Sequence, residues 1–265
     1  SGIDFGAISS PTNGQGLYTN TKNSEGGTIK YFRGGTYCAY TDYLAENSSG
    51  TKCIAVGGTW DSTTYHCSLN DSQSTCTGKG FTYYELKNNV MFAGKAWKIV
   101  RINGDGTIRL LYNGTSPSAR GTASQLSATA FNTNYNNAKY IGYVYDTSTS
   151  STIKGIVDSW YSSNLTSYAS SLTDVGFCND RSGTSSAYGA YLRLYTNKTP
   201  TFSCPNIAGD LYTISSNSIG NKKLTYPIGL ITADEVAYAG SVYGTNNYTY
   251  YMQSGSYYWT MSPYF

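Results

Sequence analysis

The sequence predicts an α+β fold rich in β-structure, made of antiparallel sheets with two short helices and a disulfide-stapled insert. Three observations predict it: the composition, a β-rich segment around a tight turn, and six cysteines. Charged residues make up 12% of the 265-residue chain, against about 25% in ordinary soluble domains. Ser, Thr, Asn, 29 Gly and 28 Tyr take their place. Because strand and loop surfaces accept these residues better than helix surfaces do, the composition favours β-structure.

We expect residues 1–265 to form a single β-rich domain, since a chain of this length buries enough surface for one core. Residues 37–88 are interpreted as an insert within that domain. They contain four of the cysteines, are polar, and show neither helical nor strand periodicity. An excursion of this kind would be held together by its disulfides.

The clearest strand signal lies in the middle of the chain. The runs 89–103 and 107–112 are rich in β-branched and aromatic residues and flank the turn sequence Asn103-Gly-Asp-Gly106. A short Asp-Gly turn between such runs predicts an antiparallel hairpin, which we place at the centre of the core. Further strands are expected at 28–33, 140–145 and 191–195.

The two helices are predicted from different signals. Over 153–171, apolar residues such as Ile153, Val157 and Trp160 recur at the spacing of one helical face. The sequence Thr232-Ala-Asp-Glu235 has the form of a capping box, in which the two outer side chains accept hydrogen bonds from each other's backbone. Gly240 is expected to end that second helix.

The even number of cysteines predicts disulfide bonds and therefore an oxidising, extracellular location. A zinc site would need closely spaced pairs, whereas 14, 13 and 8 residues separate Cys38, Cys53, Cys67 and Cys76. Three pairings of these four are open. We favour Cys53–Cys67 nested inside Cys38–Cys76, because two short strands around residues 57–61 would place Cys53 opposite Cys67.

Cys178 and Cys204 then pair by elimination. Closing that loop would contribute about 3 kcal/mol to stability.

The charge distribution argues against a nucleic-acid partner. The net charge is +3 and the longest basic run is Lys222-Lys223, whereas phosphate binding needs many basic side chains on one face. Apolar stretches such as Trp97–Ile102 are far shorter than the roughly 20 residues of a membrane span. We expect neither nucleic-acid binding nor a membrane span in this chain, and an export signal in a part removed or absent from it.

Each candidate catalytic or metal-binding residue has a simpler structural explanation. His66 is the single histidine, so a Ser–His–Asp triad would have to use it. It adjoins a cysteine in the polar insert, where a histidine is more often a surface residue than a member of a triad. Asp234 or Glu235 could act as a glycosidase carboxylate, but a glycosidase needs two carboxylates across a cleft. The capping box already explains Glu235. The turn at 103–106 lacks the spaced ligands of a calcium loop. We predict no enzyme activity, no cofactor and no metal.

The C-terminal segment is the candidate binding surface. Tyr with Asn, Ser and Gly is typical of adaptable binding surfaces, because Tyr offers a large rigid area with one hydrogen-bonding end. The alternative is that these rings alternate between the buried and solvent faces of a sheet. The candidate residues are Tyr248, Tyr250, Tyr251, Tyr257, Tyr258 and Trp259.

Several motifs occur in a fixed order along the chain: Thr12–Tyr18, Tyr31–Gly34, Phe92–Arg101, Asn132–Tyr135 with Ile141–Tyr143, Gly229–Gly240 and Trp259–Pro263. Together they resemble a large, uncharacterised group of exported surface proteins from Gram-positive gut bacteria. The resemblance covers most of the chain outside the insert and carries no known chemistry. The closing Trp-Thr-Met-Ser-Pro is also similar to C-type-lectin-like and formylglycine-enzyme-like folds.

Members of that group usually continue past the Trp-x-x-Ser-Pro motif into further strands. A missing final strand would leave an edge open to another chain's strand. Two functions are therefore expected. The first is a structural or adhesive protein of the cell surface, as a subunit of a filament or pilus-like appendage. The alternative is a lectin-like module that binds carbohydrate. The partners would be further copies of the chain, or a host or cell-surface ligand such as a glycan.

Overall fold

The structure is a computed structural model that describes residues 16–21, 23, 26–40, 50–51, 54, 59–61, 66–69, 72–134, 140–145, 149–184, 187–217, 219–241, 250–254 and 256–263. The fold is α+β, and all pairs of named strands are antiparallel. Two disulfides are described, Cys38–Cys76 and Cys178–Cys204, which are the pairings favoured from the sequence. The predicted antiparallel α+β class is confirmed.

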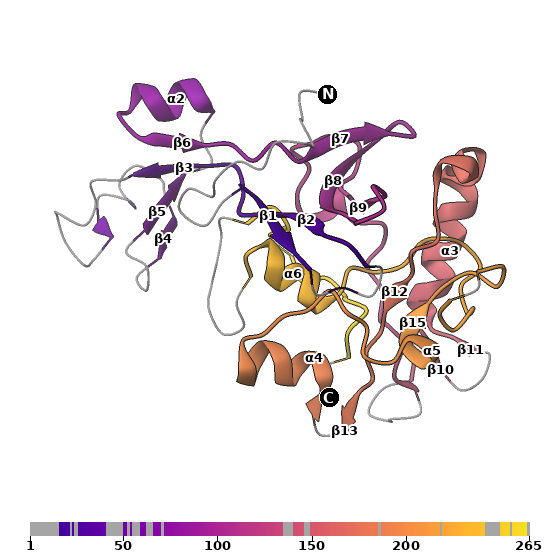
Figure 1. Ribbon diagram of the computed structural model, residues 1–265. Coiled ribbons are helices and arrows are strands. Elements are labelled where there is room, and N and C mark those ends of the chain that lie inside the picture. The colour runs from indigo at the N-terminus through magenta and orange to yellow at the C-terminus, as the bar shows by residue number, and fades with distance from the viewer. Residues whose placement is uncertain are drawn as a thin grey trace.

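A five-stranded sheet forms the centre of the molecule (Figure 1). Its long strand β8 pairs with β2 and β7 along one side and with β9 along the other. β1 lies at the far edge, where β2 is its one neighbour among the described strands. The strands are β1 (Gly16–Asn20), β2 (Ile29–Arg33), β7 (Asn89–Phe92), β8 (Lys95–Ile102) and β9 (Ile108–Tyr112).

The predicted hairpin is the β8–β9 pair. Its turn is held by Asp105, whose carboxylate accepts hydrogen bonds from the Thr107 backbone N–H (2.9 Å) and hydroxyl (2.7 Å). Gly106 has a φ of 87°, which side chains disfavour. The run 89–103 differs from expectation because it is two strands. A turn at Ala93-Gly94, where φ is 52° and 68°, separates β7 from β8.

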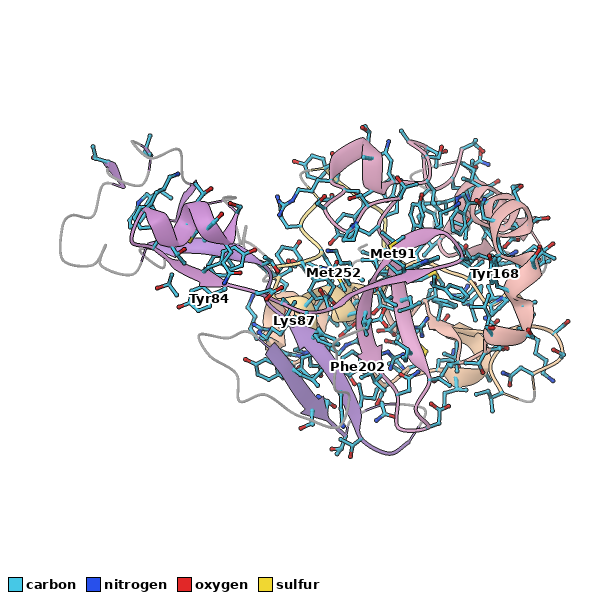
Figure 2. The ribbon with its side chains drawn as sticks, turned by 90° about the horizontal axis from the view of Figure 1, so that it is seen from above. Tyr84, Lys87, Met91, Tyr168, Phe202 and Met252 are labelled. Carbon is cyan, nitrogen blue, oxygen red and sulfur yellow. A yellow bond between two sulfur atoms is a disulfide. The ribbon has the colours of Figure 1, made fainter. Side chains whose placement is uncertain are left out.

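The cysteine insert folds as its own four-stranded sheet, which projects from the rest of the molecule (Figures 1 and 2). The Cys38–Cys76 disulfide is buried at its centre, against Trp60, Phe81 and Tyr83. Residues 59–61, expected in a turn, form a strand instead, and the predicted Cys53–Cys67 bond lies outside the described residues. The elements are β3 (Tyr37–Tyr40), β4 (Thr59–Asp61), β5 (His66–Leu69), α2 (Gln73–Gly78) and β6 (Thr82–Tyr84).

Both predicted helices are present. α3 (Thr152–Asn164) begins after Ser151, whose hydroxyl accepts a hydrogen bond from Lys154 N, and it continues as the 3-10 helix η4 (Thr166–Ser171). α6 (Ala233–Ala239) starts with the complete capping box and ends at Gly240, where φ is 127°.

The predicted number of helices, two, was too low, because the described residues contain three further short α-helices. These are α2, α4 (Gly189–Tyr191) and α5 (Ile207–Asp210). The strand predicted at 191–195 is helical, since α4 runs on into the π-helical η5 (Leu192–Asn197). Within it Tyr191 and Tyr195 stack, with ring centroids 5.1 Å apart. Of the strand predicted at 140–145, only Val144–Tyr145 is a strand among the described residues.

The remaining elements are short. The strands pair as β10–β11, β12–β15 and β13–β14, and the Cys178–Cys204 disulfide starts from β12. They are η2 (Gly121–Ser124), β10 (Val144–Tyr145), β11 (Thr149–Ser150), β12 (Phe177–Cys178), β13 (Gly183–Thr184), β14 (Ala187–Tyr188) and β15 (Leu211–Tyr212).

Apolar side chains cover both faces of the central sheet. On one face Trp97 packs with Tyr161 and Leu165 of the α3 region. On the other, Val100 packs with Ile231, Ala239 of α6 and Met252. We call these two groups of side chains the Trp97 layer and the Val100 layer. β9 lies between them, in the position that an interior strand would have.

Candidate functional site

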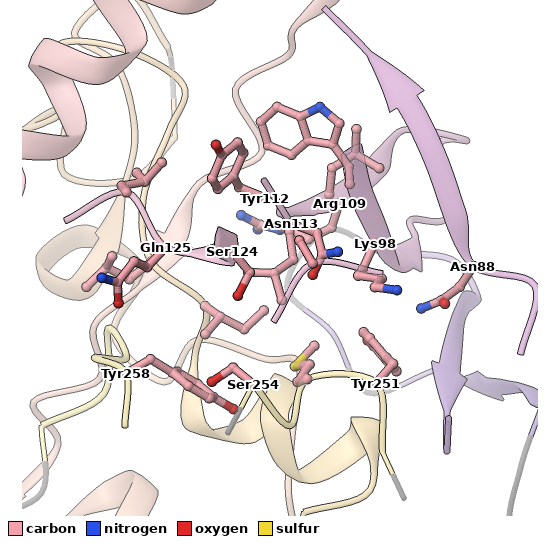
Figure 3. A pocket seen from close by; sticks show the side chains of 18 of the residues that line it. Asn88, Lys98, Arg109, Tyr112, Asn113, Ser124, Gln125, Tyr251, Ser254 and Tyr258 are labelled. Atoms are coloured by element: carbon pink, nitrogen blue, oxygen red, sulfur yellow. The ribbon is translucent and has the colours of Figure 1, made fainter. Parts of the chain in front are cut away.

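A groove of about 1660 Å³ borders β9, and all five residues of that strand line it. Figure 3 shows Arg109, Tyr112 and Asn113 on one side of this groove, facing Ser254 and Tyr258 of the C-terminal segment. The α3 helix and the loop that contains η2 complete the wall. We call this feature the β9 groove.

Among the described residues, the outer edge of β9 has no partner strand. In the β8–β9 ladder, Asn113 N donates to Ala96 O (2.9 Å) and Asn103 N donates to Thr107 O (2.8 Å). Because bonded and non-bonded positions alternate, the backbone N–H and C=O groups of Ile108, Leu110 and Tyr112 point away from β8. No residue that the structure describes hydrogen-bonds to those groups.

The groove is lined by side chains that belong to the core. Leu110, Trp160 and Ile228 are only partly buried, yet they pack against the Trp97 layer. Leu126 and Leu230 extend this apolar lining against the neighbouring core cluster. Protein interiors are close-packed, with few voids larger than a water molecule. The groove has the volume and the apolar lining that could accommodate another polypeptide segment.

One part of the groove carries positive charge. Lys98 projects from β8 and donates hydrogen bonds to Asn89 Oδ1 (2.5 Å) and Pro117 O (2.9 Å). Burial, with a smaller contribution from nearby Arg120, lowers the pKa of Lys98 to about 8. Both residues line the groove, and no described carboxylate lies within ion-pair distance of either.

The predicted aromatic surface is divided between the groove and the core. Tyr257 is fully exposed, whereas Trp259 is 51% exposed and its indole N–H donates to Thr129 O (2.8 Å). Tyr258 is 41% exposed, and all three line the groove.

The earlier tyrosines of the segment are more enclosed. Tyr250 and Tyr251 are partly buried and pack against the Val100 layer. The Tyr251 hydroxyl is buried without a hydrogen-bond partner among the described residues, and this burial raises its pKa well above the usual value. Tyr248 lies outside the described residues, and none of the described tail residues forms a strand.

Asp234 and Glu235 belong to a buried ionic cluster beside the β9 groove, and neither of them lines the groove. Glu235 Oε1 lies 3.3 Å from Arg101 Nε and 3.6 Å from Arg109 Nε. Asp234 binds Arg193, which also binds Asp180. These arginines are matched by carboxylates, and their pairing joins β8 and β9 to α6.

Arg109 is the link between that cluster and the groove. Its guanidinium lies over the Phe177 ring at 4.1 Å and donates to Gly176 O. Together with its Glu235 contact, this holds β9 in place on the side where no described strand pairs with it.

Two other candidates add no site. The side chain of His66 on β5 lies outside what the structure describes. Among the described residues, no group of three or more His, Cys, Asp or Glu side chains could hold a metal ion, and no helix is long and apolar enough to cross a membrane. Comparison with known proteins found no matching family model, no similar curated protein and no similar solved structure.

Sequence reasoning missed the groove, although β9 itself carried a signal for it. Four of its five residues, Ile108, Leu110, Leu111 and Tyr112, are apolar or aromatic, so both faces are apolar. That pattern is typical of an interior strand covered on both faces. β9 has this pattern but has only one described neighbour in the sheet.

Proposed function

We propose that this chain is an extracellular bacterial surface protein with a structural and adhesive role, a subunit of a cell-surface filament. The subunit accepts a strand from another polypeptide along β9. One observation carries the proposal: the open backbone edge of β9 lies inside a groove lined by core side chains.

Strand addition satisfies two requirements of this site at once. The outward N–H and C=O groups of Ile108, Leu110 and Tyr112 gain partners, which converts an exposed edge into an interior ladder. The apolar side chains of the incoming strand fill the space beside Leu110 and Trp160. Main-chain bonds supply affinity in this mode of recognition, and pockets for alternate side chains supply specificity.

The rest of the molecule supports a location outside the cytoplasm. Disulfides persist in oxidising compartments, and two are described here.

Electron microscopy and light scattering of the purified full chain test the proposal. We expect polymers whose mass grows with protein concentration, and their loss in Ile108→Lys, because a charge on an edge strand blocks pairing. Ile108 is 43% exposed, so this change leaves the core intact. Met91→Lys is the matched control, because Met91 is 57% exposed on β7, across β8 from β9. A wild-type chain that stays monomeric at all concentrations would refute the filament role.

The second candidate is carbohydrate binding by a lectin-like surface, favoured by the exposed rings of Tyr257, Tyr258 and Trp259. Exposed aromatic faces stack on sugar rings, and the amides beside the groove can bind hydroxyls. A glycan array should then show binding that Tyr257→Ala removes. Tyr195→Ala is the control, because Tyr195 is 47% exposed but lies outside the β9 groove. No binding to any glycan on the array would rule this candidate out.

A further inference from the structure

We infer that the strand accepted by the β9 groove is the N-terminal segment of a second copy of this chain, residues 2–8. The inference rests on the proposed strand-accepting function and names its partner. It follows from the sequence of that segment, the shape and charge of the groove, and the order of strands in the central sheet.

The segment has the pattern that the groove requires. In Gly2-Ile-Asp-Phe-Gly-Ala-Ile8, Ile3, Phe5 and Ala7 alternate with Asp4 and Gly6. In a strand, alternate side chains point to opposite faces. One face of a strand formed by this segment would therefore be apolar, with Ile3, Phe5 and Ala7. The other would carry the negative charge of Asp4 between two glycines, followed by Ile8.

Each face of such a strand meets a matching part of the groove. Leu110 and Tyr112 project from β9 into the layer that contains Trp160, which would receive Ile3 and Phe5. Leu111 lies opposite Lys98 in the ladder and projects to the other face. Asp4 would be directed to that face, where Lys98 and Arg120 have no described carboxylate partner. The apolar lining and the positive charge of Lys98 and Arg120 are thus both complementary to this segment.

The order of strands favours a donor from another copy. β1, which begins at Gly16, lies at the opposite edge of the sheet from β9, with β2 and β8 between them. Both faces of the sheet are covered, by the Trp97 layer and by the Val100 layer. A segment from a neighbouring copy can reach β9 from outside without crossing these layers.

This arrangement makes assembly open-ended. The donor segment and the acceptor groove are different surfaces of the same chain, so each added copy still offers one of each. Contacts of this head-to-tail type produce filaments when the rotation between subunits does not close into a ring.

Two full-length variants, each defective in one surface, test the inference. Phe5→Asp disables the donor and Ile108→Lys disables the acceptor. We expect each variant alone to be monomeric, and their equimolar mixture to form a complex of twice the 28.7 kDa chain mass without longer polymers. Only one productive donor and one productive acceptor exist in that mixture. Ser10→Asp, which adds the same charge outside the alternating stretch, should polymerise like the wild type.

The outcomes separate the inference from the function on which it rests. If Phe5→Asp polymerises normally while Ile108→Lys does not, another segment is the donor and the inference is overturned, although strand acceptance stands. If both variants polymerise, the groove is not the assembly site. If the segment binds its own chain instead, the mixture gives no complex, and this also overturns the inference. A peptide of residues 1–12 should bind the Phe5→Asp monomer and fail to bind Ile108→Lys.

Discussion

Leu110 of β9 lies opposite Ile99 of β8, and at this level of the central sheet no described strand follows Leu110. The backbone N–H and C=O groups on the outer side of the last strand in a sheet normally face solvent. Here the edge opens into a groove lined by core residues. The proposed function depends on this side of the β8–β9 hairpin, where no described strand pairs with β9.

Amide hydrogen exchange should distinguish the two edges of β9. In the monomer, the outward N–H groups of Ile108, Leu110 and Tyr112 should exchange fast, whereas Asn113 N–H, bonded to Ala96 O, should be protected. Assembly should protect the three outward amides and leave Asn113 unchanged. Equal exchange of the outward amides in monomer and polymer would show that the edge remains open after assembly.

Removing the Glu235 charge should destabilise the fold strongly. Glu235 is 5% exposed and pairs with Arg101 and Arg109, which are 4% and 11% exposed. Breaking a buried pair by deleting one partner costs about 3–5 kcal/mol, because the other charges stay buried. We expect a loss of that size in Glu235→Gln by denaturant unfolding. Glu85→Gln is the control, since Glu85 is exposed and its pair with Lys87 spans 3.9 Å. A loss below about 1 kcal/mol in Glu235→Gln would contradict the prediction.

Lys98 should make stability rise with pH in a mildly alkaline window. Burial, helped by Arg120, lowers its pKa from 10.5 to about 8. Between these values the unfolded chain holds more protons on this group than the folded chain does, so the free energy of unfolding increases with pH. Unfolding curves from pH 7 to 10 should show this rise in the wild type, reduced in Lys98→Met. The same slope in both proteins would mean that Lys98 titrates normally.

Buried tyrosines should reverse that trend at higher pH. Burial and the neighbouring Tyr31 raise the pKa of Tyr238 from 10.0 to about 12. Burial also raises the pKa of Tyr143 and that of Tyr251. Their stabilising contribution is present below pH 10 and is lost as pH rises, because the unfolded chain ionises first.

The Tyr238→Phe variant isolates one part of this effect. It removes the hydroxyl that donates to Pro200 O (2.7 Å), which should cost about 1 kcal/mol at neutral pH. It should also lose stability less steeply than the wild type between pH 10 and 12. An unchanged pH dependence, measured by denaturant unfolding, would show that Tyr238 does not contribute.

Local signals in the sequence predicted local structure well. The capping box at Thr232 and the stop at Gly240 define α6, and the Asp-Gly turn defines the β8–β9 hairpin. In both cases the bonds that form the element lie within a few residues of each other. Of the three open pairings of the clustered cysteines, the favoured one contained Cys38–Cys76, and Cys178–Cys204 followed by elimination; both bonds are present.

Elements that depend on distant contacts were missed. The segment 191–195 has the apolar and aromatic character of a strand, but Arg193 is bound by Asp180 and Asp234 from elsewhere in the chain. A helical turn presents Arg193 to both carboxylates and stacks Tyr191 on Tyr195. The β9 groove is likewise made by segments as far apart in the chain as Gly35 and Trp259, so its walls could not be assembled from sequence patterns.

The insert leaves the main body and returns to it at one place. Tyr37 at the start of β3 pairs with Tyr84 at the end of β6, and their rings stack at 5.1 Å. The two connections are therefore neighbours, and the Cys38–Cys76 bond closes the lobe just beyond them. Replacing the lobe would leave the ends of β2 and β7 where they are. Tyr37 and Tyr83 at the base of the lobe also line the β9 groove. A foreign epitope could therefore be grafted beyond this base, provided that the paired ends of β3 and β6 are kept.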